Sequence, residues 1–496
     1  MARTIPIMAT AAPVKPAAPS ASEARFGFRN WPAFEKKMRD AGQSDASIAA
    51  FRHNYEQLVS GVSGLLPESE ISPVASLPRL DSISTPVPSG AALSSLLSAT
   101  AVLKLNGGLG TSMGLERAKS LLPVKDGKTF LDLIAEQIEL LRSRAGSEVR
   151  FVLMNSFSTS ADTKAYLSRE HASLVSEPDS ELLQNASLKV DAATLLPASY
   201  PPNPELEWCP PGHGDIYPSL LGTGLLARLR AAGVRHLFVS NSDNLGATLD
   251  LRVLAWFAAS GAPFAMEVAE RTASDTKGGH LARRRADGRL VLRESAMCPD
   301  EDKPAFEDIA THKYFNTNNL WVSLDALDAA LAKNGGVLPL PLIKNKKTVN
   351  PRDATTEKVF QLETAMGAAI ECFDGAQALV VPRSRFAPVK TCGDLLVLRS
   401  DAYRITPEAT VELAREPPAP AVRLDDKHYK LVDQLDALVD VTPSLKDARS
   451  LRVLGAVRFG PGVVVKGDVV VDATAAAGAE APTLANVVLQ DETRKL

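Results

Sequence analysis

Residues 101–114 read AVLKLNGGLGTSMG, and Lys119 follows shortly after them. The mostly apolar first five residues indicate a short buried strand, and glycines directly after a strand let the backbone approach a ligand. Backbone N–H groups exposed in such a turn can hold a phosphate group. The stretch lacks the GK[ST] ending of a Walker loop and the later acidic residue of a dinucleotide fingerprint. It therefore predicts a strand followed by a phosphate-binding turn of another kind.

Two further apolar runs end in polar residues in the same way. Residues 151–155 and 236–241 each end in asparagine, and helical stretches at 130–141 and 220–232 lie between the three strands. Strands that alternate with helices predict an α/β fold with a doubly wound, mostly parallel sheet. Ligands of such sheets bind just beyond the carboxyl ends of the strands. The glycine- and asparagine-rich ends therefore predict the position of the binding site.

The chain divides into four predicted parts. Residues 1–25, rich in alanine and proline, are predicted to form a disordered tail. Residues 26–97 are predicted to form a helical segment and a proline-rich linker that pack on a larger body. The main α/β domain spans residues 98–412. Residues 421–496 carry apolar residues and glycines at a spacing of about six, which predicts a small parallel β-helix.

Composition excludes several classes of protein. The 496 residues include 55 Lys and Arg against 58 Asp and Glu, and this net charge of −3 gives no nucleic-acid footprint. The longest uncharged run, residues 82–103, contains two prolines and six serines, unlike a membrane span. The four cysteines form no CxxC pair, which argues against a zinc site or a disulfide scaffold and favours the reducing cytoplasm.

Two polar turns carry candidate functional groups. In residues 210–215, PPGHGD, two prolines set a rigid entry and two glycines leave the His213 side chain projecting from an unencumbered backbone. Residues 241–244, NSDN, end the third strand, and Asp243 offers the oxygen ligands that Mg2+ prefers. The structural alternatives are a solvated loop histidine and, for Asp243, the N-cap of a helix that begins near Leu249.

Eight segments taken together resemble one protein family. They are KLNGGLGTSMG with Lys119, MNSFSTSADT, PPGHGDIY, SNSDNLGAT, TKGGHLA, FNTNNLW, QLETAMGAAI and PRSRFAPVKT. In this order, between roughly Leu103 and Tyr403, they are similar to the UTP–glucose-1-phosphate uridylyltransferases, also called UDP-glucose pyrophosphorylases. The resemblance implies a Rossmann-like nucleotidyltransferase domain with a β-helical tail. It also implies Mg2+ as cofactor and the conversion of UTP and glucose 1-phosphate to UDP-glucose and pyrophosphate.

The resemblance further implies which residues bind the substrates. The nucleotide-binding positions are Leu105, Asn106, Gly107, Gly108, Lys119, Gln184, Gly212, Asp243 and Lys390. The sugar-phosphate positions are His213, Asn241, Ser242, Gly279, Glu294, Asn318 and Lys347. The implied catalytic residues are Lys119, Lys390 and Asp243, the last also as the Mg2+ ligand. In IKNKK, residues 343–347, Lys344 and Lys346 replace the Val and the Pro or Ala common in the family, which leaves open which lysine contacts substrate.

These residue types suit phosphoryl transfer. A sugar phosphate has a second pKa near 6, so its oxygen is already an anionic nucleophile at neutral pH and needs no general base. The obstacle is repulsion between two polyanions, because two unit charges at 4 Å interact by about 4 kcal/mol at an effective dielectric near 20. We expect Mg2+ on Asp243 to bridge phosphate oxygens, Lys390 to neutralise the α-phosphoryl group and the sugar phosphate, and Lys119 to hold the departing pyrophosphate.

The motifs argue against two alternative functions. A relative acting on N-acetylhexosamine 1-phosphate or on several sugar 1-phosphates would carry LxGGxGTRLG at the first loop, where this chain has Asn106 and Ser112-Met113. A binding protein without activity would have lost the two lysines or Asp243, and all three are present. Discrimination of galactose from glucose rests on few hydrogen bonds, so the motifs do not decide it. UTP and glucose 1-phosphate are the expected partners, and a β-helical tail of this kind can mediate self-association.

Overall fold

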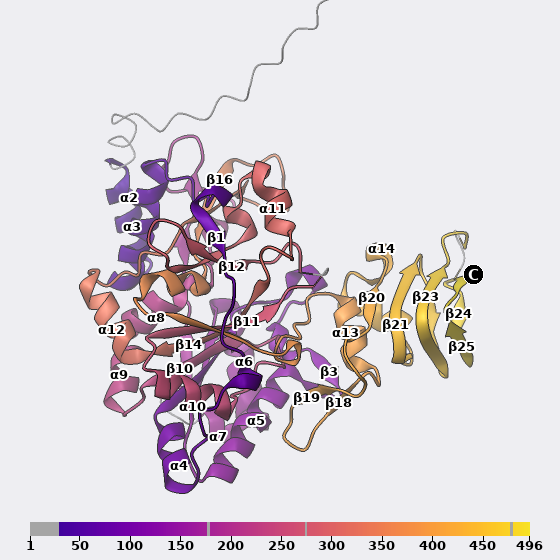
Figure 1. Cartoon of the computed structure of the whole chain (residues 1–496). Helices are drawn as coiled ribbons and strands as arrows, with labels where there is room; N and C mark the ends of the chain where they lie inside the picture. The colour runs from indigo at the N-terminus through magenta and orange to yellow at the C-terminus, as the bar shows by residue number, and fades with distance from the viewer. Residues whose placement is uncertain (1–28, 176–178, 273–274, 477–479) are drawn as a thin grey trace, which may run out of the picture.

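The computed structural model describes residues 29–175, 179–272, 275–476 and 480–496 (Figure 1). The tail predicted for residues 1–25 lies outside the described residues. Within these ranges ten strands form one central sheet, and helices pack around it. The α/β class predicted from the sequence is therefore confirmed.

One half of the central sheet is the parallel arrangement that the sequence predicts. Side by side and parallel lie β10 (His236–Asn241), β2 (Thr100–Asn106), β5 (Arg150–Asn155) and β6 (Glu181–Leu183). Between β2 and β5 the chain forms α5 (Phe130–Ala145), which begins in a capping box and confirms the helix expected over 130–141. Because these strands share one direction, their carboxyl ends meet at one edge.

Further helices follow the strands of this half. α6 (Phe157–Glu170), α8 (Ile216–Gly222) and α9 (Leu225–Ala231) lie between β5 and β10 in the chain, and α10 (Leu251–Ser260) leads from β10 to the other half. The single helix predicted over 220–232 is thus wrong: α8 and α9 are separate, because Gly224 adopts the left-handed conformation with φ 73° between them.

The other half of the sheet is mixed, so the prediction of a mostly parallel sheet is wrong there. In this half, β14 (Tyr314–Ser323) lies antiparallel between β10 and β11 (Phe264–Glu270), and β17 (Gln377–Val380) pairs in parallel with β11. β12 (His280–Arg284) and β13 (Leu290–Arg293) form the hairpin expected at Asp287-Gly288. Because α10 makes a helical crossover from β10 to β11, these two strands run in one direction and β14 enters the gap from the opposite direction.

The N-terminal segment packs along the main body (Figure 1). It comprises α2 (Trp31–Asp40), α3 (Asp45–Val59), β1 (Ile71–Pro73) and α4 (Gly90–Ser98). The apolar faces of α2 and α3 form an aromatic cluster with strands of the main body, and β1 pairs with β12. The domain boundaries stay predictions.

The C-terminal lobe, residues 421–496, projects from one side of the main body (Figure 1). One set of parallel strands contains β20 (Ala421–Arg423), β21 (Ser444–Leu454), β23 (Val463–Asp472), β25 (Val487–Gln490) and β26 (Thr493–Lys495). A second parallel pair is β22 (Arg458–Phe459) with β24 (Thr483–Leu484). Alternate residues of β23 are buried, and the lobe shares one apolar core with α5 and the rest of the main body.

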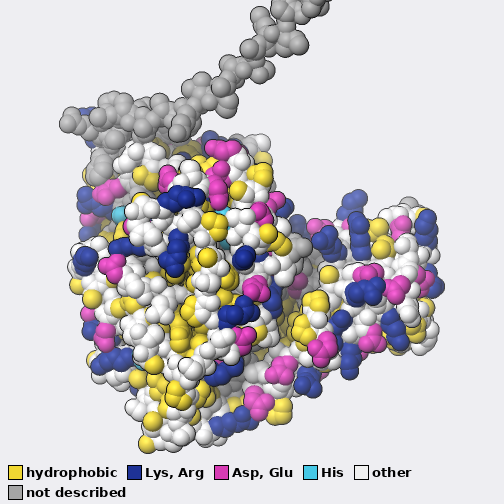
Figure 2. Space-filling model, in the orientation of Figure 1, with side chains coloured by type: hydrophobic (Ala, Val, Ile, Leu, Met, Phe, Trp, Pro, Cys, Tyr) yellow, Lys and Arg dark blue, Asp and Glu magenta, His cyan; other side chains and the backbone are white. Residues whose placement is uncertain are grey.

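Short elements complete the chain. The helices are α7 (Ala172–Val175), α11 (Lys303–Glu307), α12 (Leu324–Lys333), α13 (Cys392–Arg399), α14 (Asp426–Tyr429) and α15 (Val432–Leu438). The strands are β3 (Pro123–Lys125), β4 (Lys128–Thr129), β7 (Ser187–Leu188), β8 (Val190–Asp191), β9 (Trp208–Cys209), β15 (Ile343–Thr348), β16 (Lys358–Glu363), β18 (Tyr403–Ile405) and β19 (Val411–Leu413). Among the described residues, no helix is both long and apolar enough to span a membrane. Basic and acidic side chains are interspersed over the face shown in Figure 2.

A buried ion pair lies at the centre of the mixed half of the sheet. Glu267 on β11 is fully buried, and its two carboxylate oxygens accept hydrogen bonds of 2.7 Å from Arg385. Asn319 and Trp321 on β14 donate to the same carboxylate at 3.0 and 2.9 Å. Removing one partner of such a pair leaves the other charge buried without compensation.

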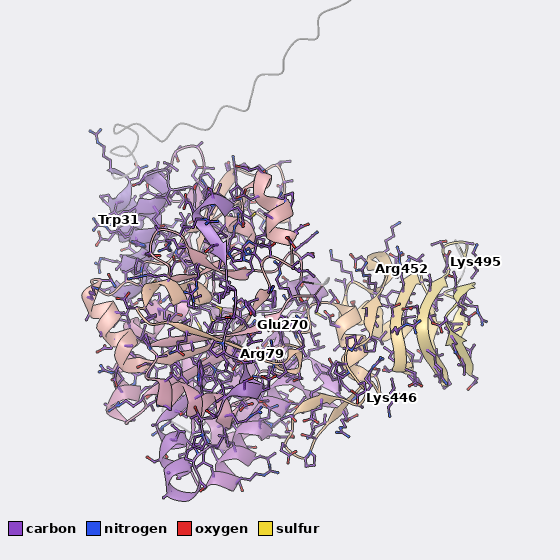
Figure 3. All side chains as sticks on the ribbon, viewed as in Figure 1. Trp31, Arg79, Glu270, Lys446, Arg452 and Lys495 are labelled. Atoms are coloured by element: carbon purple, nitrogen blue, oxygen red, sulfur yellow. The ribbon has the colours of Figure 1, made fainter. Side chains whose placement is uncertain are left out.

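We predict that Glu267→Gln lowers the free energy of unfolding by about 3 kcal/mol, because the buried Arg385 charge then keeps only the longer ion pair with Asp250, at 3.9 Å. Chemical denaturation measures this loss. Glu270→Gln is the matched control: its exposed ion pair with Arg79, at 2.6 Å, lies on the same strand (Figure 3), and its loss costs at most about 1 kcal/mol. Equal losses for the two variants would contradict the prediction.

Candidate active site

The carboxyl ends of β2, β5 and β10 are joined by side-chain hydrogen bonds. Asn106 at the end of β2 donates to Asn155 at the end of β5 at 2.7 Å, and Ser242, after β10, donates to Asn106 at 3.4 Å. The Ser242 N–H also bonds the Leu105 carbonyl at 3.2 Å. These contacts bring predicted nucleotide residues and predicted sugar-phosphate residues to one edge of the sheet.

A buried lysine, Lys104, links two segments at the same edge of the sheet through hydrogen bonds. The Lys104 Nζ donates to the Ser240 hydroxyl at 2.7 Å and to the Ala247 carbonyl at 2.5 Å. Burial lowers the pKa of Lys104 to about 7, helped by the nearby charge of Arg385 and opposed by Glu267. The lysine thus connects β2 to β10 and to the loop that carries Asp243.

Three of the predicted nucleotide-binding residues, Gly107, Gln184 and Gly212, lie together. An added Cβ at Gly107 would be 2.8 Å from the Gln184 side-chain oxygen, and the Gln184 amide donates to the Gly212 carbonyl at 3.3 Å. The Gln184 backbone N–H bonds the Asn155 carbonyl at 2.7 Å, which fixes the residue to the end of β5. The segment of Gln184 therefore closes one side of the turn after β2.

Asp215 positions this corner and was not predicted as a site residue. Its carboxylate accepts hydrogen bonds from the Asn185 N–H at 2.8 Å, from the Asn185 side chain at 3.0 Å and from Ser219 at 2.7 Å. Burial raises the pKa of Asp215 to about 6, although these hydrogen bonds lower it. Asp215 therefore joins the PPGHGD turn to the residue that follows Gln184.

His213 is held as a neutral ring. Gly212 has φ 80°, and an added Cβ there would lie 2.5 Å from the Thr364 carbonyl, so the turn packs against the segment after β16. The Met366 N–H donates to His213 Nδ1 at 2.9 Å, which leaves the ring proton on Nε2. Burial lowers the pKa of His213 to about 4. At neutral pH His213 is therefore a hydrogen-bond donor without charge.

Lys119 and Asp243 form an ion pair between the glycine-rich turn and the end of β10. Their Nζ and Oδ2 atoms are 2.8 Å apart, and Lys119 also donates to the Val389 carbonyl. The N-cap alternative for Asp243 is wrong, because α10 begins at Leu251 and its N-cap is Asp250, which accepts the Arg252 N–H at 2.8 Å. Asp243 is thus free of a capping role.

The segment that carries Lys390 is bonded directly to the Asp243 loop. The Val389 N–H donates to the Asp243 carbonyl at 3.2 Å. Asn244 is buried, accepts the Ala387 N–H at 3.0 Å and donates to the Arg385 carbonyl at 3.1 Å. Lys390 itself precedes α13, and its N–H bonds Asp394 in the N-terminal capping box of that helix. Asn244 was not predicted as a site residue either.

The predicted sugar-binding residues form a second cluster. The Glu294 carboxylate lies directly over Gly279, where an added Cβ would collide with it, and the Gly279 carbonyl accepts the Asn316 N–H at 3.1 Å. The Asn316 side chain donates to Asn318 at 2.9 Å, and Asn318 adopts a left-handed φ of 60°. Burial raises the pKa of Glu294, against the opposing effects of the Asn316 hydrogen bond and the charge of Lys390. This charge interaction places Lys390 near the cluster.

The structure separates the three lysines of β15. The Lys344 and Lys346 ammonium groups lie over the Phe360 ring at 5.4 and 6.0 Å from its centre. Lys347 is on the opposite face of the strand, where its charge acts on Lys189. Within the described residues, no hydrogen bond or ion pair joins the Lys347 side chain to the other predicted site residues. At the end of β10, the Asn241 carbonyl accepts the Asn244 N–H at 3.3 Å.

The site contains no ready-made metal cage. Within the described residues, no group of three or more His, Cys, Asp or Glu side chains could hold a metal ion. Asp243 is a half-buried carboxylate whose Oδ2 faces Lys119. One carboxylate plus substrate phosphates is a donor set that suits Mg2+, which keeps several waters when it binds to proteins.

The arrangement defines a class of protein. A glycine-rich turn, two lysines and one aspartate at the carboxyl edge of an α/β sheet suit a phosphorylated nucleotide, and a polar cluster beside them suits a sugar. The profile of the UTP–glucose-1-phosphate uridylyltransferase family matches residues 48–466.

Individual relatives agree with the family match. The UTP–glucose-1-phosphate uridylyltransferase of Saccharomyces cerevisiae is 41% identical over 376 residues, which cover 76% of this chain and 74% of the relative. That of Solanum tuberosum is 41% identical over 399 residues, covering 80% and 81%. A mutant UDP-glucose pyrophosphorylase from Leishmania major, solved in complex with UDP-glucose, is 46% identical with a TM-score of 0.88, covering 94% of this chain and 99% of that one. The chain belongs to the UTP–glucose-1-phosphate uridylyltransferase family.

We predict that His213 makes the fold less stable in acid. Its pKa is near 6.5 in the unfolded chain and about 4 in the fold, so the unfolded state binds the extra proton as the pH falls through this window. The loss is about 2 kcal/mol between pH 7.5 and pH 5.

The measurement compares urea denaturation of the wild type and His213→Asn at both pH values. Asparagine keeps an acceptor for the Met366 N–H and does not titrate, so the pH-dependent loss should be smaller in the variant by that amount. An identical loss in both proteins would show that His213 is not held neutral.

Proposed function

We propose that the protein makes UDP-glucose and pyrophosphate from UTP and glucose 1-phosphate. Membership of the family supports this reaction, as does the complex of the Leishmania major relative with UDP-glucose. The observation that carries the proposal is the junction of three segments: Lys119, Asp243 and the backbone before Lys390 are directly bonded to one another at the carboxyl edge of the sheet. That junction brings the segments that carry the two proposed catalytic lysines, Lys119 and Lys390, to the place where the phosphates of the nucleotide would lie.

The mechanism is attack of a sugar-phosphate oxygen on the α-phosphorus of UTP, in line with the bond to pyrophosphate. A new phosphorus–oxygen bond forms, the bond to the pyrophosphate oxygen breaks, and the electron pair leaves with pyrophosphate. Lys390 neutralises the α-phosphoryl group and the sugar phosphate, and Lys119 holds the departing pyrophosphate. The neutral His213 ring donates a hydrogen bond from its Nε2–H to an oxygen of the sugar phosphate, and the proton stays on the ring.

The substrates occupy two neighbouring places. The turn from Leu105 to Gly108 lies on the nucleotide, and an added Cβ at Gly108 would meet no atom within 4 Å, so space is open there for a ligand. Gln184 and the Gly212 backbone read the uracil, while Asn241 and Ser242 lie by the sugar phosphate. The hexose contacts Gly279, Glu294 and Asn318, and Lys347 is the basic residue of β15 that contributes to this side.

Mg2+ is the proposed cofactor, with Asp243 as its protein ligand. When bound, the ion would supply charge neutralisation to the phosphate oxygens. Lys119 pairs with the Asp243 carboxylate in the structure, so one side chain balances the other before substrate binds.

Three wider properties are proposed on structural grounds. The C-terminal lobe is a parallel β-helix, supported by its two sets of parallel strands. The protein works in the cytoplasm, supported by four cysteines that are all free thiols. Self-association through the lobe stays a prediction.

We predict that Lys390→Ala lowers kcat about 100- to 1,000-fold, because the variant loses a positive charge at the reacting phosphates. Pyrophosphate release from UTP, Mg2+ and glucose 1-phosphate measures the rate. Lys446→Ala, a change in the C-terminal lobe (Figure 3), is the control and should keep kcat within about twofold of the wild type. A near-normal kcat for a folded Lys390→Ala protein would contradict the role of this residue.

A further inference from the structure

A buried polar cluster lies behind the proposed hexose site. In the hairpin register His280 on β12 is directly opposite Arg293 on β13, and both are fully buried. Their chain neighbours Gly279 and Glu294 belong to the hexose site. Because successive side chains in a strand point to opposite faces, His280 and Arg293 point away from that site and form its back wall.

The cluster is built from rings and charges that water does not reach. The His280 and His312 rings stack with centroids 3.9 Å apart, and Phe306 lies against His280 at 4.9 Å. The Arg293 and Arg271 guanidinium groups lie over the same Phe306 ring, at 5.8 and 5.7 Å. Burial and the neighbouring positive charges lower the pKa of His280 far below its ordinary value, so its ring is neutral.

One carboxylate from the N-terminal segment connects these groups. Glu68 lies just before β1, and its Oε2 is 2.6 Å from Arg293 while its Oε1 is 2.9 Å from His312 Nε2. Asp302 accepts from Arg293 at 2.9 Å and from the Glu68 N–H at 2.6 Å. The Leu66 N–H bonds the Met297 carbonyl at 2.7 Å, so the same segment is also fixed to the turn after Glu294.

The cluster has little tolerance for the loss of Glu68. Within the described residues, the buried atoms without a hydrogen-bond partner include both ring nitrogens of His280, His312 Nδ1, and the Nε atoms of Arg271 and Arg293. Without the Glu68 charge, the fully buried Arg293 guanidinium would keep Asp302 as its one carboxylate partner, and the loss of charge compensation at its other end favours a shift of the side chain. Glu294 follows Arg293 in the chain and would shift with it.

We propose that Glu68 is a positioning residue for the hexose site: it fixes Arg293 and His312 and thereby the place of Glu294 over Gly279. This inference rests on the proposed function, because it takes the cluster of Gly279, Glu294 and Asn318 as the hexose site. It assigns the N-terminal segment a part in sugar recognition, although that segment does not itself line the site. Nucleotide binding, at the other cluster, does not depend on Glu68.

The experiment uses the full chain with Glu68→Gln and measures binding of UDP and of UDP-glucose by calorimetry. Glutamine keeps the size of the side chain but removes the charge that pairs with Arg293. We expect Kd for UDP-glucose to rise about five- to tenfold, while Kd for UDP stays within about twofold. In turnover assays KM for glucose 1-phosphate should rise by a similar factor, with KM for UTP unchanged.

Glu70→Gln is the matched control, because Glu70 is exposed in the same short turn. The Glu70→Gln protein should bind UDP and UDP-glucose with the same Kd values as the wild type. Equal Kd values for Glu68→Gln and the wild type, or equal weakening for UDP and UDP-glucose, would overturn the proposal. If Glu68→Gln does not fold, Asp302→Asn is the second variant, because asparagine keeps an acceptor for the Glu68 N–H. We expect this variant to show the same selective weakening of UDP-glucose binding. Unchanged UDP-glucose binding by Asp302→Asn would also overturn the proposal. A wild type that binds no UDP-glucose would instead contradict the proposed function.

Discussion

The candidate site depends on the close approach of two backbone segments, residues 243–246 and 384–390. An added Cβ at Gly246 would collide with the Ser384 carbonyl, so only glycine allows the segments to lie this close. Asn244 then bonds across the gap to Arg385 and Ala387, and Asp243 and Val389 bond through their backbones. The Arg385 guanidinium in turn donates two hydrogen bonds to the buried Glu267 carboxylate. Lys390 acquires its position next to Asp243 and Lys119 from these contacts.

The proposed chemistry of the site depends on which of its side chains are charged and which are neutral. The reaction brings two polyanions together, so fixed positive groups at the phosphates lower the barrier without any proton transfer. His213 supplies a hydrogen bond and no charge, since the Met366 N–H occupies its Nδ1. In the proposed mechanism the positive charges at the phosphates are those of Lys119, which pairs with Asp243, and of Lys390, which follows the segment bonded to the Asp243 loop. The proposed hexose cluster contains amides and a carboxylate, which suit hydroxyl groups.

Features governed by short stretches of sequence could be predicted. The strand and turn at residues 101–114, the helix over 130–141 and the hairpin at Asp287-Gly288 each have local signals, and the structure contains all three. The break between α8 and α9 also has a local signal, because Gly224 is a residue at which a helix readily ends. The direction of β14 had none, because a strand's own periodicity does not say which neighbours it will lie between.

The residues that position the site could not be predicted from the sequence, because their partners are distant in the chain. Asn244 was visible at a strand end, but its partners Arg385 and Ala387 lie more than a hundred residues further along the chain. Asp215 was visible beside His213, but its bond to Asn185 depends on how two turns fold together. Glu68 has no sequence signal, since the positioning role proposed for it depends on partners that are distant in the chain: Arg293 on β13, His312 in the loop before β14, and Asp302. Motifs thus identify groups that touch a ligand more readily than the groups that hold them in place.

The central claim is that these groups transfer a uridylyl group to glucose 1-phosphate. The most direct test is pyrophosphate release by the purified chain from UTP and Mg2+ with glucose, galactose and N-acetylglucosamine 1-phosphates compared side by side. We expect turnover with a strong preference for glucose 1-phosphate. Comparable rates with all three sugars would contradict the assigned specificity, and no release with any of them would contradict the assigned reaction.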